Sequence, residues 1–335
     1  MRLSVLDQSP IRSGGNATDA IRETLTLAET TDRLGYARYW LAEHHGSSGL
    51  ASASPEILIE AVASRTAHIR VGSGGVMLPH YSPLKVAESF RMLEALHPRR
   101  IDLGVGRAPG SDRLTAHALA AGLGRPGIDA YPEQLMDLYG YLSNSLPEEH
   151  VYSRVKAMPE VSTMPELWVL GSSDASARYA AELGWSFCFA HFINPIGGGE
   201  AMRAYRERFQ ASPFLAEPRG ILAVSATVAD TPEEAERLSW SRWCWRIAGP
   251  RGAIHGIPSV EEALAFAYTA PEREYIEFMR GNSIHGDLAK VKARLTSLAE
   301  EYEVDEVMAV TITHDFGARV HSYELLAEAF GLTAP

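Results

Sequence analysis

The sequence alternates between short apolar segments and amphipathic segments with helical spacing along most of its length. We interpret the apolar segments as eight strands, at 3–6, 38–42, 69–79, 100–107, 167–170, 186–190, 220–228 and 305–311. Helical segments lie between and after them, at 19–34, 54–66, 82–96, 131–145, 174–183, 200–210, 231–247, 287–302 and 319–330. Such connections are right-handed crossovers, which build parallel sheets. Eight repeats predict an α/β fold of the (β/α)8 type, the TIM barrel.

The main alternative for this alternation is an open, doubly wound sheet that binds a dinucleotide. That fold carries a glycine-rich turn after its first strand, and this chain has Asp7-Gln8-Ser9-Pro10 there. No linker or internal repeat divides the chain, so we expect one domain over residues 1–335. Loop insertions at 108–130, 146–165 and 248–286 are expected at the C-terminal face of the barrel, and the last is long enough for a lid.

Composition narrows the classes of partner. Hydrophobic residues make up 46% of the chain, and 31 basic against 42 acidic residues give a net charge of −11. An acidic chain without a basic run argues against nucleic acid or an anionic membrane as a partner. No run approaches the roughly 18–20 apolar residues of a membrane span. Two isolated cysteines and an N-terminus without the apolar core of a signal peptide favour a cytoplasmic protein.

In a barrel of this type, chemistry collects where the strands end. Titratable and small residues occupy many of these positions. They are Asp7, Glu43-His44-His45, Gly74-Gly75, Arg107, Gly171-Ser172-Ser173, His191 and His314. Histidine exchanges protons most readily near neutral pH, so the pair after the second strand is the first candidate for catalysis.

Three of these positions have a structural as well as a functional explanation. Glycines at 72–75 indicate either a bulge or a close approach of a ligand to the backbone. The segment 171–176 precedes a helix, where its serines are either ordinary N-caps or, with free backbone N–H groups, a phosphate site. Arg107 either lies in solvent or supplies a cation to that phosphate.

The paired histidines do not predict a metal centre. Adjacent residues on an extended backbone point in opposite directions, so His44 and His45 do not converge on one ion. A metal-binding barrel would need a His-x-His pair or further convergent carboxylates, which we do not find in the sequence. We therefore expect no metal.

Five motifs resemble the bacterial luciferase-like family, whose members are flavin-dependent monooxygenases on a TIM barrel. Three follow one another in order: Trp40-Leu41-Ala42-Glu43-His44-His45, Gly72-Ser73-Gly74-Gly75-Val76-Met77-Leu78-Pro79 and Arg100-Ile101-Asp102-Leu103-Gly104-Val105-Gly106-Arg107. The other two are Arg107-Ala108-Pro109-Gly110-Ser111-Asp112 and Trp168-Val169-Leu170-Gly171-Ser172-Ser173. They are typical of the stand-alone oxidoreductases rather than the light-emitting subunits. The resemblance covers nearly the whole chain and is specific for the family, but not for a substrate.

The resemblance implies roles for matching residues. His44 is similar to the family histidine near the flavin C4a atom, which helps to stabilise a peroxyflavin, and Glu43 is its catalytic neighbour. Gly74-Gly75 matches the position of a non-prolyl cis peptide beneath the isoalloxazine ring. Positions that contact the flavin phosphate correspond to Arg107, Ser173, Ser176 and Tyr131.

Three further residues complete the expected cofactor site, and one position departs from the family pattern. Asp7, Gly171 and Ser172 are included because they lie at strand ends beside the matched positions. Where the luciferase subunit has a reactive cysteine, this chain has Gly106. We therefore do not expect light emission.

The implied activity is that of a monooxygenase. It would use reduced FMN and O2 to form a C4a-peroxyflavin and oxidise a small organic substrate. An F420-dependent dehydrogenase on the same barrel is one alternative. A flavin-binding protein without catalytic activity is another, although the retained Glu43, His44 and Arg107 argue against it.

The family predicts a homodimer and leaves other points open. The flavin is reduced either in place by NAD(P)H or by a separate flavin reductase. Either histidine of the pair is able to face the flavin. We expect His44 to do so and His45 to turn toward the surrounding structure.

Overall fold

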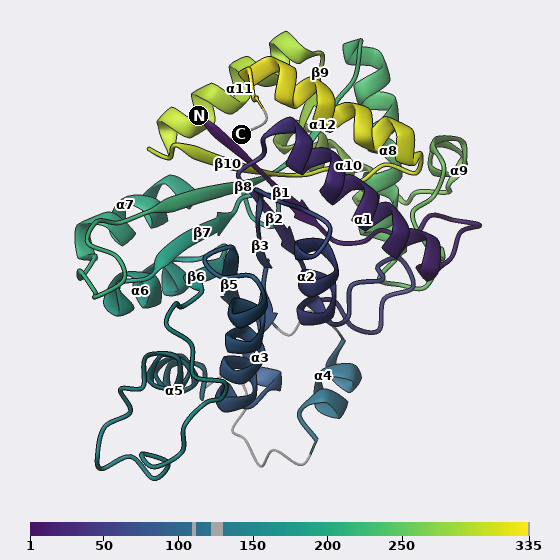
Figure 1. Ribbon diagram of the computed structural model, residues 1–335. Coiled ribbons are helices and arrows are strands. Elements are labelled where there is room, and N and C mark those ends of the chain that lie inside the picture. Colours follow the sequence, from purple (N-terminus) through teal and green to yellow (C-terminus); the bar gives the residue numbers. More distant parts are fainter. Residues whose placement is uncertain (109–111, 122–129, 334–335) are drawn as a thin grey trace.

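The computed structural model describes residues 1–108, 112–121 and 130–333, and these form a closed parallel barrel surrounded by helices (Figure 1). The barrel strands are β1 (Arg2–Asp7), β2 (Arg38–Leu41), β3 (Arg70–Ser73), β5 (Ile101–Gly106), β6 (Glu166–Gly171), β7 (Ser186–Ala190), β8 (Gly220–Val228) and β10 (Glu306–Val310). Neighbours in this order pair in parallel, and β10 pairs with both β8 and β1, which closes the barrel. The predicted TIM barrel is confirmed.

Helices surround the strands and return the chain to the start of the next strand. They are α1 (Ala17–Leu34), α2 (Pro55–Ala63), α3 (Pro83–Leu96), α5 (Tyr131–Ser143), α6 (Asp174–Leu183), α7 (Gly198–Arg208), α8 (Pro232–Ala248), α11 (Leu288–Glu301) and α12 (Phe316–Phe330). Local signals explain several boundaries. The side chain of Thr231 accepts a hydrogen bond from the N–H of Glu234 and so begins α8, and Gly35, with φ of 84°, ends α1.

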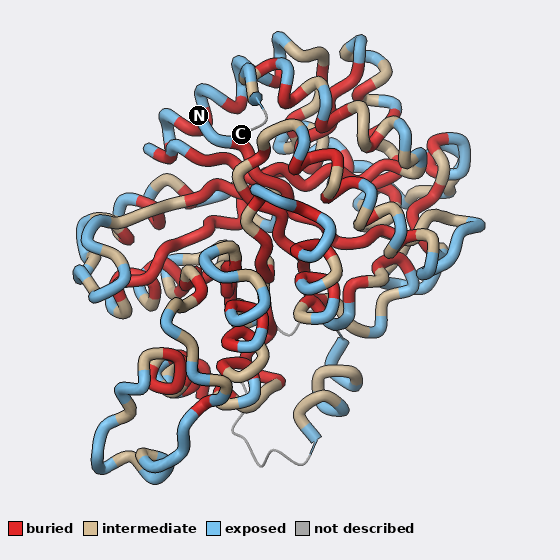
Figure 2. The backbone as a smooth tube through the Cα atoms, viewed as in Figure 1, coloured by how far each residue is buried: buried red, intermediate tan, exposed pale blue. Residues whose placement is uncertain are grey.

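Apolar side chains form two layers, one on each side of the barrel wall. The larger layer lies between strands and helices. In Figure 2 the barrel strands are mostly coloured as buried, and the helices around them carry both buried and exposed residues. The smaller layer fills the barrel interior and includes Leu6, Trp40, Trp168, Cys188 and Met308. These inward side chains come from five different strands, so the interior is a packed core rather than a pore.

Charged side chains fill the barrel at the end where the strands begin. We call Arg38, Asp102, Glu166 and Glu306 the charged cluster. The Arg38 guanidinium donates to Asp102 at 2.6 Å, to Glu166 at 2.9 Å and to Glu306 at 2.9 Å. Burial alone would raise the pKa of Asp102, but Arg38 and Arg70 hold it below its usual value. The charged cluster leaves the opposite end, where the strands finish, for a ligand.

The irregular segments differ in detail from the sequence expectation. The strand expected at 69–79 is broken: β3 ends at Ser73, and β4 (Val76–Met77) and the 3-10 helix η1 (Leu78–His80) follow. Segment 108–130 contains α4 (Arg113–Leu119), and its residues 109–111 and 122–129 lie outside the described residues. Segment 146–165 joins α5 to β6, a helix-to-strand connection at the end where the strands begin rather than at the expected C-terminal face.

Segment 248–286, expected as a loop insertion, contains helices and a strand. It contains α9 (Val260–Ala265), α10 (Ala270–Asn282) and β9 (Ile284–Gly286). β9 pairs in parallel with the end of β8, from Ala226 to Val228, so the segment is anchored at the C-terminal face. Among the described helices, none is both long and apolar enough to cross a membrane.

Candidate functional site

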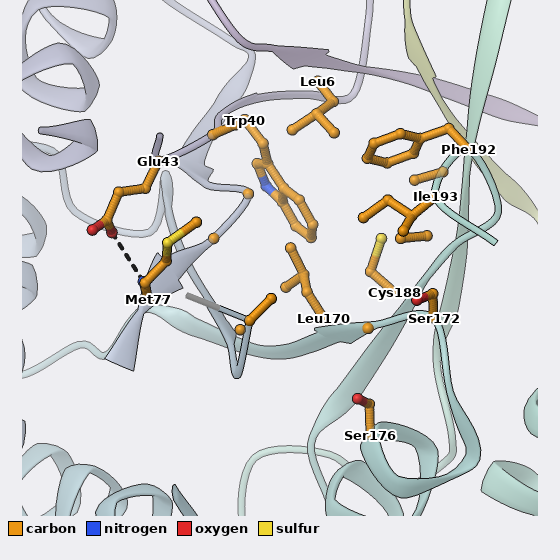
Figure 3. Close-up of a pocket in the computed structure, with 18 of the residues that line it drawn as sticks. Leu6, Trp40, Glu43, Met77, Leu170, Ser172, Ser176, Cys188, Phe192 and Ile193 are labelled. Carbon is orange, nitrogen blue, oxygen red and sulfur yellow. Dashed lines mark hydrogen bonds between the residues drawn. The ribbon is translucent and has the colours of Figure 1, made fainter. Parts of the chain in front are cut away.

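A cavity of about 360 Å³ lies at the end of the barrel where the strands finish (Figure 3). Its volume is that of a typical small-molecule site. Figure 3 shows apolar side chains, among them Trp40, Leu170 and Cys188, in the middle of the cavity, with Glu43 on one side and Ser172 and Ser176 on another. The sequence-predicted residues that line the cavity are Glu43, His44, Gly74, Gly75, Arg107, Gly171, Ser172, Ser173 and Ser176.

The two histidines after β2 have different environments. His44 lines the cavity, and its Nδ1 is buried without a hydrogen-bond partner among the described residues. Burial, and to a lesser extent the nearby His45, lower the pKa of His44 to about 4. At neutral pH the imidazole is therefore uncharged, with one nitrogen able to donate and the other able to accept a hydrogen bond.

His45 turns away from the cavity toward Glu43. Its Nε2 lies 2.7 Å from Oε1 of Glu43, and it is not among the residues that line the cavity. This arrangement follows from the extended backbone, on which neighbouring side chains point in opposite directions. The expected placement, with His44 toward the cavity and His45 toward structure, agrees with the geometry.

Glu43 lines the cavity, but its carboxylate already accepts several hydrogen bonds. The N–H of Met77 donates to Oε2 at 2.9 Å, and the hydroxyl of Tyr81 donates to Oε1 at 2.6 Å. With His45 as a third partner, the carboxylate is held against η1 and β4 rather than left free to transfer protons. Its geometry suits a residue that positions this wall of the cavity, and the catalytic role expected from the sequence stays a prediction.

A cis peptide bond joins Gly74 and Gly75 in the cavity wall, as the family resemblance implied. Neither glycine tolerates a side chain. A Cβ at Gly74 would lie 2.6 Å from the Leu6 side chain, and one at Gly75 would lie 2.7 Å from the carbonyl oxygen of Gly104. The missing side chains thus leave room for Leu6 at Gly74 and for the backbone of Gly104 at Gly75, and the close approach of a ligand stays a prediction.

The connection between β6 and α6 forms a polar part of the cavity. Ser173 precedes the first residue of α6, and its hydroxyl does not cap the helix. A Cβ at Gly171 would lie 2.1 Å from Oγ of Ser176, so only glycine leaves room for that serine. Hydroxyl groups and a helix N-terminus at one place are a suitable environment for an anion.

Arg107 and Tyr131 add to this polar part. Arg107 lines the cavity and makes no ion pair with any described carboxylate. Tyr131 at the start of α5 does not line the cavity, but its hydroxyl is buried without a partner among the described residues. Burial raises the pKa of Tyr131, and the positive charge of nearby Arg107 opposes the rise. A cation and an unpartnered buried hydroxyl close together are features of an anion site.

Asp7, like Tyr131, is a predicted cofactor residue that does not line the cavity. It is fully buried, outside the cavity lining, and its carboxylate accepts hydrogen bonds from Arg319 at 2.7 Å, from Tyr39 at 2.5 Å and from the N–H of Ser9 at 2.7 Å. Burial would raise the pKa of Asp7, but Arg319 holds it below its usual value. With both oxygens hydrogen-bonded and the side chain fully buried, Asp7 stabilises the junction of β1, β2 and α12.

Sequence reasoning missed the apolar lining and one cation. Trp40, Leu170 and Phe192 line the cavity, as does Arg246 from α8. The apolar residues carry no distinctive signal, since each lies in a segment that any buried strand resembles. Arg246 was detectable, because Arg242 and Arg246 are charged residues one turn apart on a helix segment otherwise rich in tryptophan. Among the described residues, no group of three or more potential ligands is placed to hold a metal ion.

The chain is similar in sequence and structure to known monooxygenases. The sequence profile described as luciferase-like monooxygenase matches residues 1–306. The Bacillus subtilis protein YwcH is 46% identical, over 98% of this chain and 98% of its own length. The N-acetyl-S-alkylcysteine monooxygenase of B. subtilis is 38% identical, over 98% of each chain. The crystal structure of apo-MsnO8 superposes with a TM-score of 0.88, at 37% identity and 99% coverage of both chains.

More distant structures share the fold. One is the oxygenating constituent of the 3,6-diketocamphane monooxygenase of Pseudomonas putida, solved in complex with FMN, with a TM-score of 0.70, 19% identity and coverage of 98% of this chain and 97% of that one. Another is an F420-dependent secondary alcohol dehydrogenase, with a TM-score of 0.68, 12% identity and 98% coverage of each chain. The profile match and the relatives together show that this chain belongs to the luciferase-like monooxygenase family of oxidoreductases.

Proposed function

We propose that the protein is a monooxygenase that binds reduced FMN and oxidises a small organic substrate with O2. The observation that carries this proposal is the division of one cavity into an apolar middle and a polar part with Arg107, which pairs with no described carboxylate. The FMN complex of the camphane monooxygenase supports FMN as the cofactor, and the dehydrogenase on the same fold supports F420 as the alternative to test.

The residues present fit a flavin mononucleotide. Its phosphate would be held by Arg107, Ser173 and Ser176, and the unpartnered hydroxyl of Tyr131 supplies a further hydrogen-bonding group. Its ring would lie against the apolar middle of the cavity. When bound, reduced FMN supplies the electrons that activate O2 for transfer of one oxygen atom to the substrate.

The side chains of the protein would exclude water from the cavity, hold its wall in place and supply one titratable group, the imidazole of His44. Trp40, Leu170 and Phe192 exclude water from the middle of the cavity. His44 lines the cavity with a neutral imidazole, which is able to donate or accept a hydrogen bond. Glu43, through its bonds to Met77, fixes the wall beside it. The relative that acts on N-acetyl-S-alkylcysteine suggests a thioether as the first substrate to test.

A binding titration tests the cofactor. We expect the purified protein to bind FMN and reduced FMN, as followed by fluorescence, and Arg107→Met to weaken binding by about tenfold or more because a charge-assisted contact is lost. Arg178→Met is the matched control, since Arg178 is exposed on α6 and pairs with Glu182. Binding of F420 without FMN would instead indicate the dehydrogenase, and binding of neither would refute the proposal.

A turnover experiment tests the role of His44. With reduced FMN, O2 and N-acetyl-S-methylcysteine, we expect the sulfoxide as product. His44→Ala should lower the yield of sulfoxide per FMN oxidised and raise the yield of hydrogen peroxide, with FMN affinity within about twofold of the wild type. A large loss of affinity with an unchanged product yield would contradict this role.

A further inference from the structure

A small second cavity adjoins the candidate active site. It has a volume of about 30 Å³ and shares Phe192, Ile193 and Arg246 with the main cavity. Its other walls come from α8, which supplies Arg242, and from α10, which supplies Tyr275, Phe278 and Met279. The small cavity is therefore a side pocket between the main cavity and segment 248–286.

Arg242 in this side pocket is buried without a counterion. Its exposed fraction is 6%, and its Nε has no hydrogen-bond partner. Across the described residues, no carboxylate lies within ion-pair distance of Arg242 or of Arg246, one turn further along the same face of α8. No aspartate or glutamate is among the residues that line the side pocket.

Three other buried arginines each donate to at least one carboxylate or backbone carbonyl, although Nε of Arg91 and Nη1 of Arg319 also lack a partner among the described residues. Arg38 lies 2.6 Å from the carboxylate of Asp102, and Arg319 lies 2.7 Å from that of Asp7. Arg91 donates to backbone carbonyls, including that of Ala157 at 2.6 Å. Arg242 is the exception among these four. Burial, and then repulsion from Arg246, lower the pKa of Arg242 to about 9, whereas Tyr275 opposes the change.

A buried, unpaired guanidinium is costly unless an anion joins it. The fold places buried Arg242 and half-buried Arg246 in a side pocket whose other polar residues, His191, Ser225, Asn282 and Ser283, carry no carboxylate. A volume of about 30 Å³ accommodates about two water-sized groups, which is the size of the two oxygens of a carboxylate and too small for a whole ligand. The remainder of such a ligand would extend into the main cavity, past Phe192 and Ile193.

We propose that Arg242 and Arg246 bind the carboxylate of the substrate, so that the enzyme acts on small organic acids. The apolar part of the acid lies in the main cavity, and the guanidinium groups fix its orientation by charge-assisted hydrogen bonds. The proposal rests on the proposed function for the reaction, but the binding step is independent of the flavin.

Calorimetric titration with hexanoate and hexanamide tests the site, because the two compounds share the alkyl chain and differ in the head group, an anionic carboxylate in one and a neutral amide in the other. We expect hexanoate to bind at least about tenfold more tightly than hexanamide. Arg242→Met should abolish this preference. Arg237→Met, a control on the exposed face of the same helix, should retain it, since Arg237 pairs with Glu234 and Glu261. Arg246→Met provides a second test if Arg242→Met does not fold.

Several results of these titrations would bear against the proposed carboxylate site or the proposed function. Equal affinity for the acid and the amide, or a preference that survives in both Arg242→Met and Arg246→Met, would overturn the proposal. Inorganic phosphate that binds more tightly than hexanoate, and whose binding is lost in Arg242→Met but kept in Arg107→Met, would overturn the assignment of a carboxylate to this pocket. FMN binding is measured separately by fluorescence. A protein that prefers hexanoate but does not bind FMN would retain the acid site and lose the proposed function.

Discussion

At the scale of single residues, two histidines next to each other in the sequence have different environments in the site. His44 and His45 are adjacent and identical, yet one faces the cavity and the other bonds to Glu43. The alternation of side chains on extended backbone made this division predictable. The sequence did not reveal that Glu43 would be saturated, because its partners Met77 and Tyr81 lie more than thirty positions away.

The lowered pKa of His44 predicts a specific dependence of stability on pH. The unfolded chain takes up a proton at this residue near pH 6.5 and the folded protein only near pH 4. Between these values the unfolded state binds more protons, so stability falls as the pH decreases. From pH 7 to pH 5 we expect the wild type to lose up to about 2 kcal/mol more stability than His44→Gln. Urea unfolding at each pH measures this, and parallel curves would contradict it.

The Asp7–Arg319 pair predicts a stability effect without a binding effect. Both side chains are buried, so Asp7→Asn leaves the Arg319 charge without its partner and should cost about 3–5 kcal/mol of unfolding free energy. Asp305→Asn removes the exposed pair with Arg2 and should cost less than about 1 kcal/mol. The folded Asp7→Asn protein should bind FMN normally. A folded Asp7→Asn protein with reduced FMN affinity would instead show that Asp7 contributes to cofactor binding.

At the scale of elements, the start of α6 has the strictest packing requirement in the polar part of the cavity. In Gly171→Ala the new methyl group would meet Oγ of Ser176 at 2.1 Å and displace it. We expect FMN affinity to fall by about tenfold, as for the loss of a hydrogen bond to a charged group. In Gly199→Ala the methyl group meets nothing within 4 Å, so this variant should bind FMN as the wild type does. Equal affinities for all three proteins would exclude Ser176 from the phosphate site.

The elements differ in how well the sequence predicted them. The eight barrel strands and their helices were predictable because each segment carries its own apolar period and several carry a cap, as at Thr231. Segment 248–286 was not, because β9 is a short strand that exists through its pairing with β8. The break at Gly74-Gly75 likewise depends on close packing against Leu6 and Gly104, which local sequence does not show.

At the scale of the whole molecule, one exposed apolar groove predicts an assembly. The groove lies between α2 and α3, where Ile57, Met92 and Leu96 are 71%, 51% and 55% exposed. Exposed apolar patches often mark protein interfaces, and we propose that two copies of the chain associate here as the family predicts.

The proposed dimer is testable by sedimentation velocity. We expect the wild type to sediment as a dimer and Met92→Glu as a monomer, because a charge would be buried at the interface. Leu264→Glu is the control, since Leu264 is 55% exposed on α9, outside the groove. A monomeric wild type, or a dimeric Met92→Glu, would contradict this interface.

The charged cluster has a kinetic consequence for the proposed enzyme. It fills the barrel where the strands begin, so FMN and substrate must both reach the cavity through the opposite end. When FMN and the acid enter through the same opening, they bind one after the other. The ligand bound nearer the opening then blocks the release or the entry of the other ligand. Steady-state rates should therefore pass through a maximum as the acid concentration rises, because acid bound before the flavin blocks its arrival.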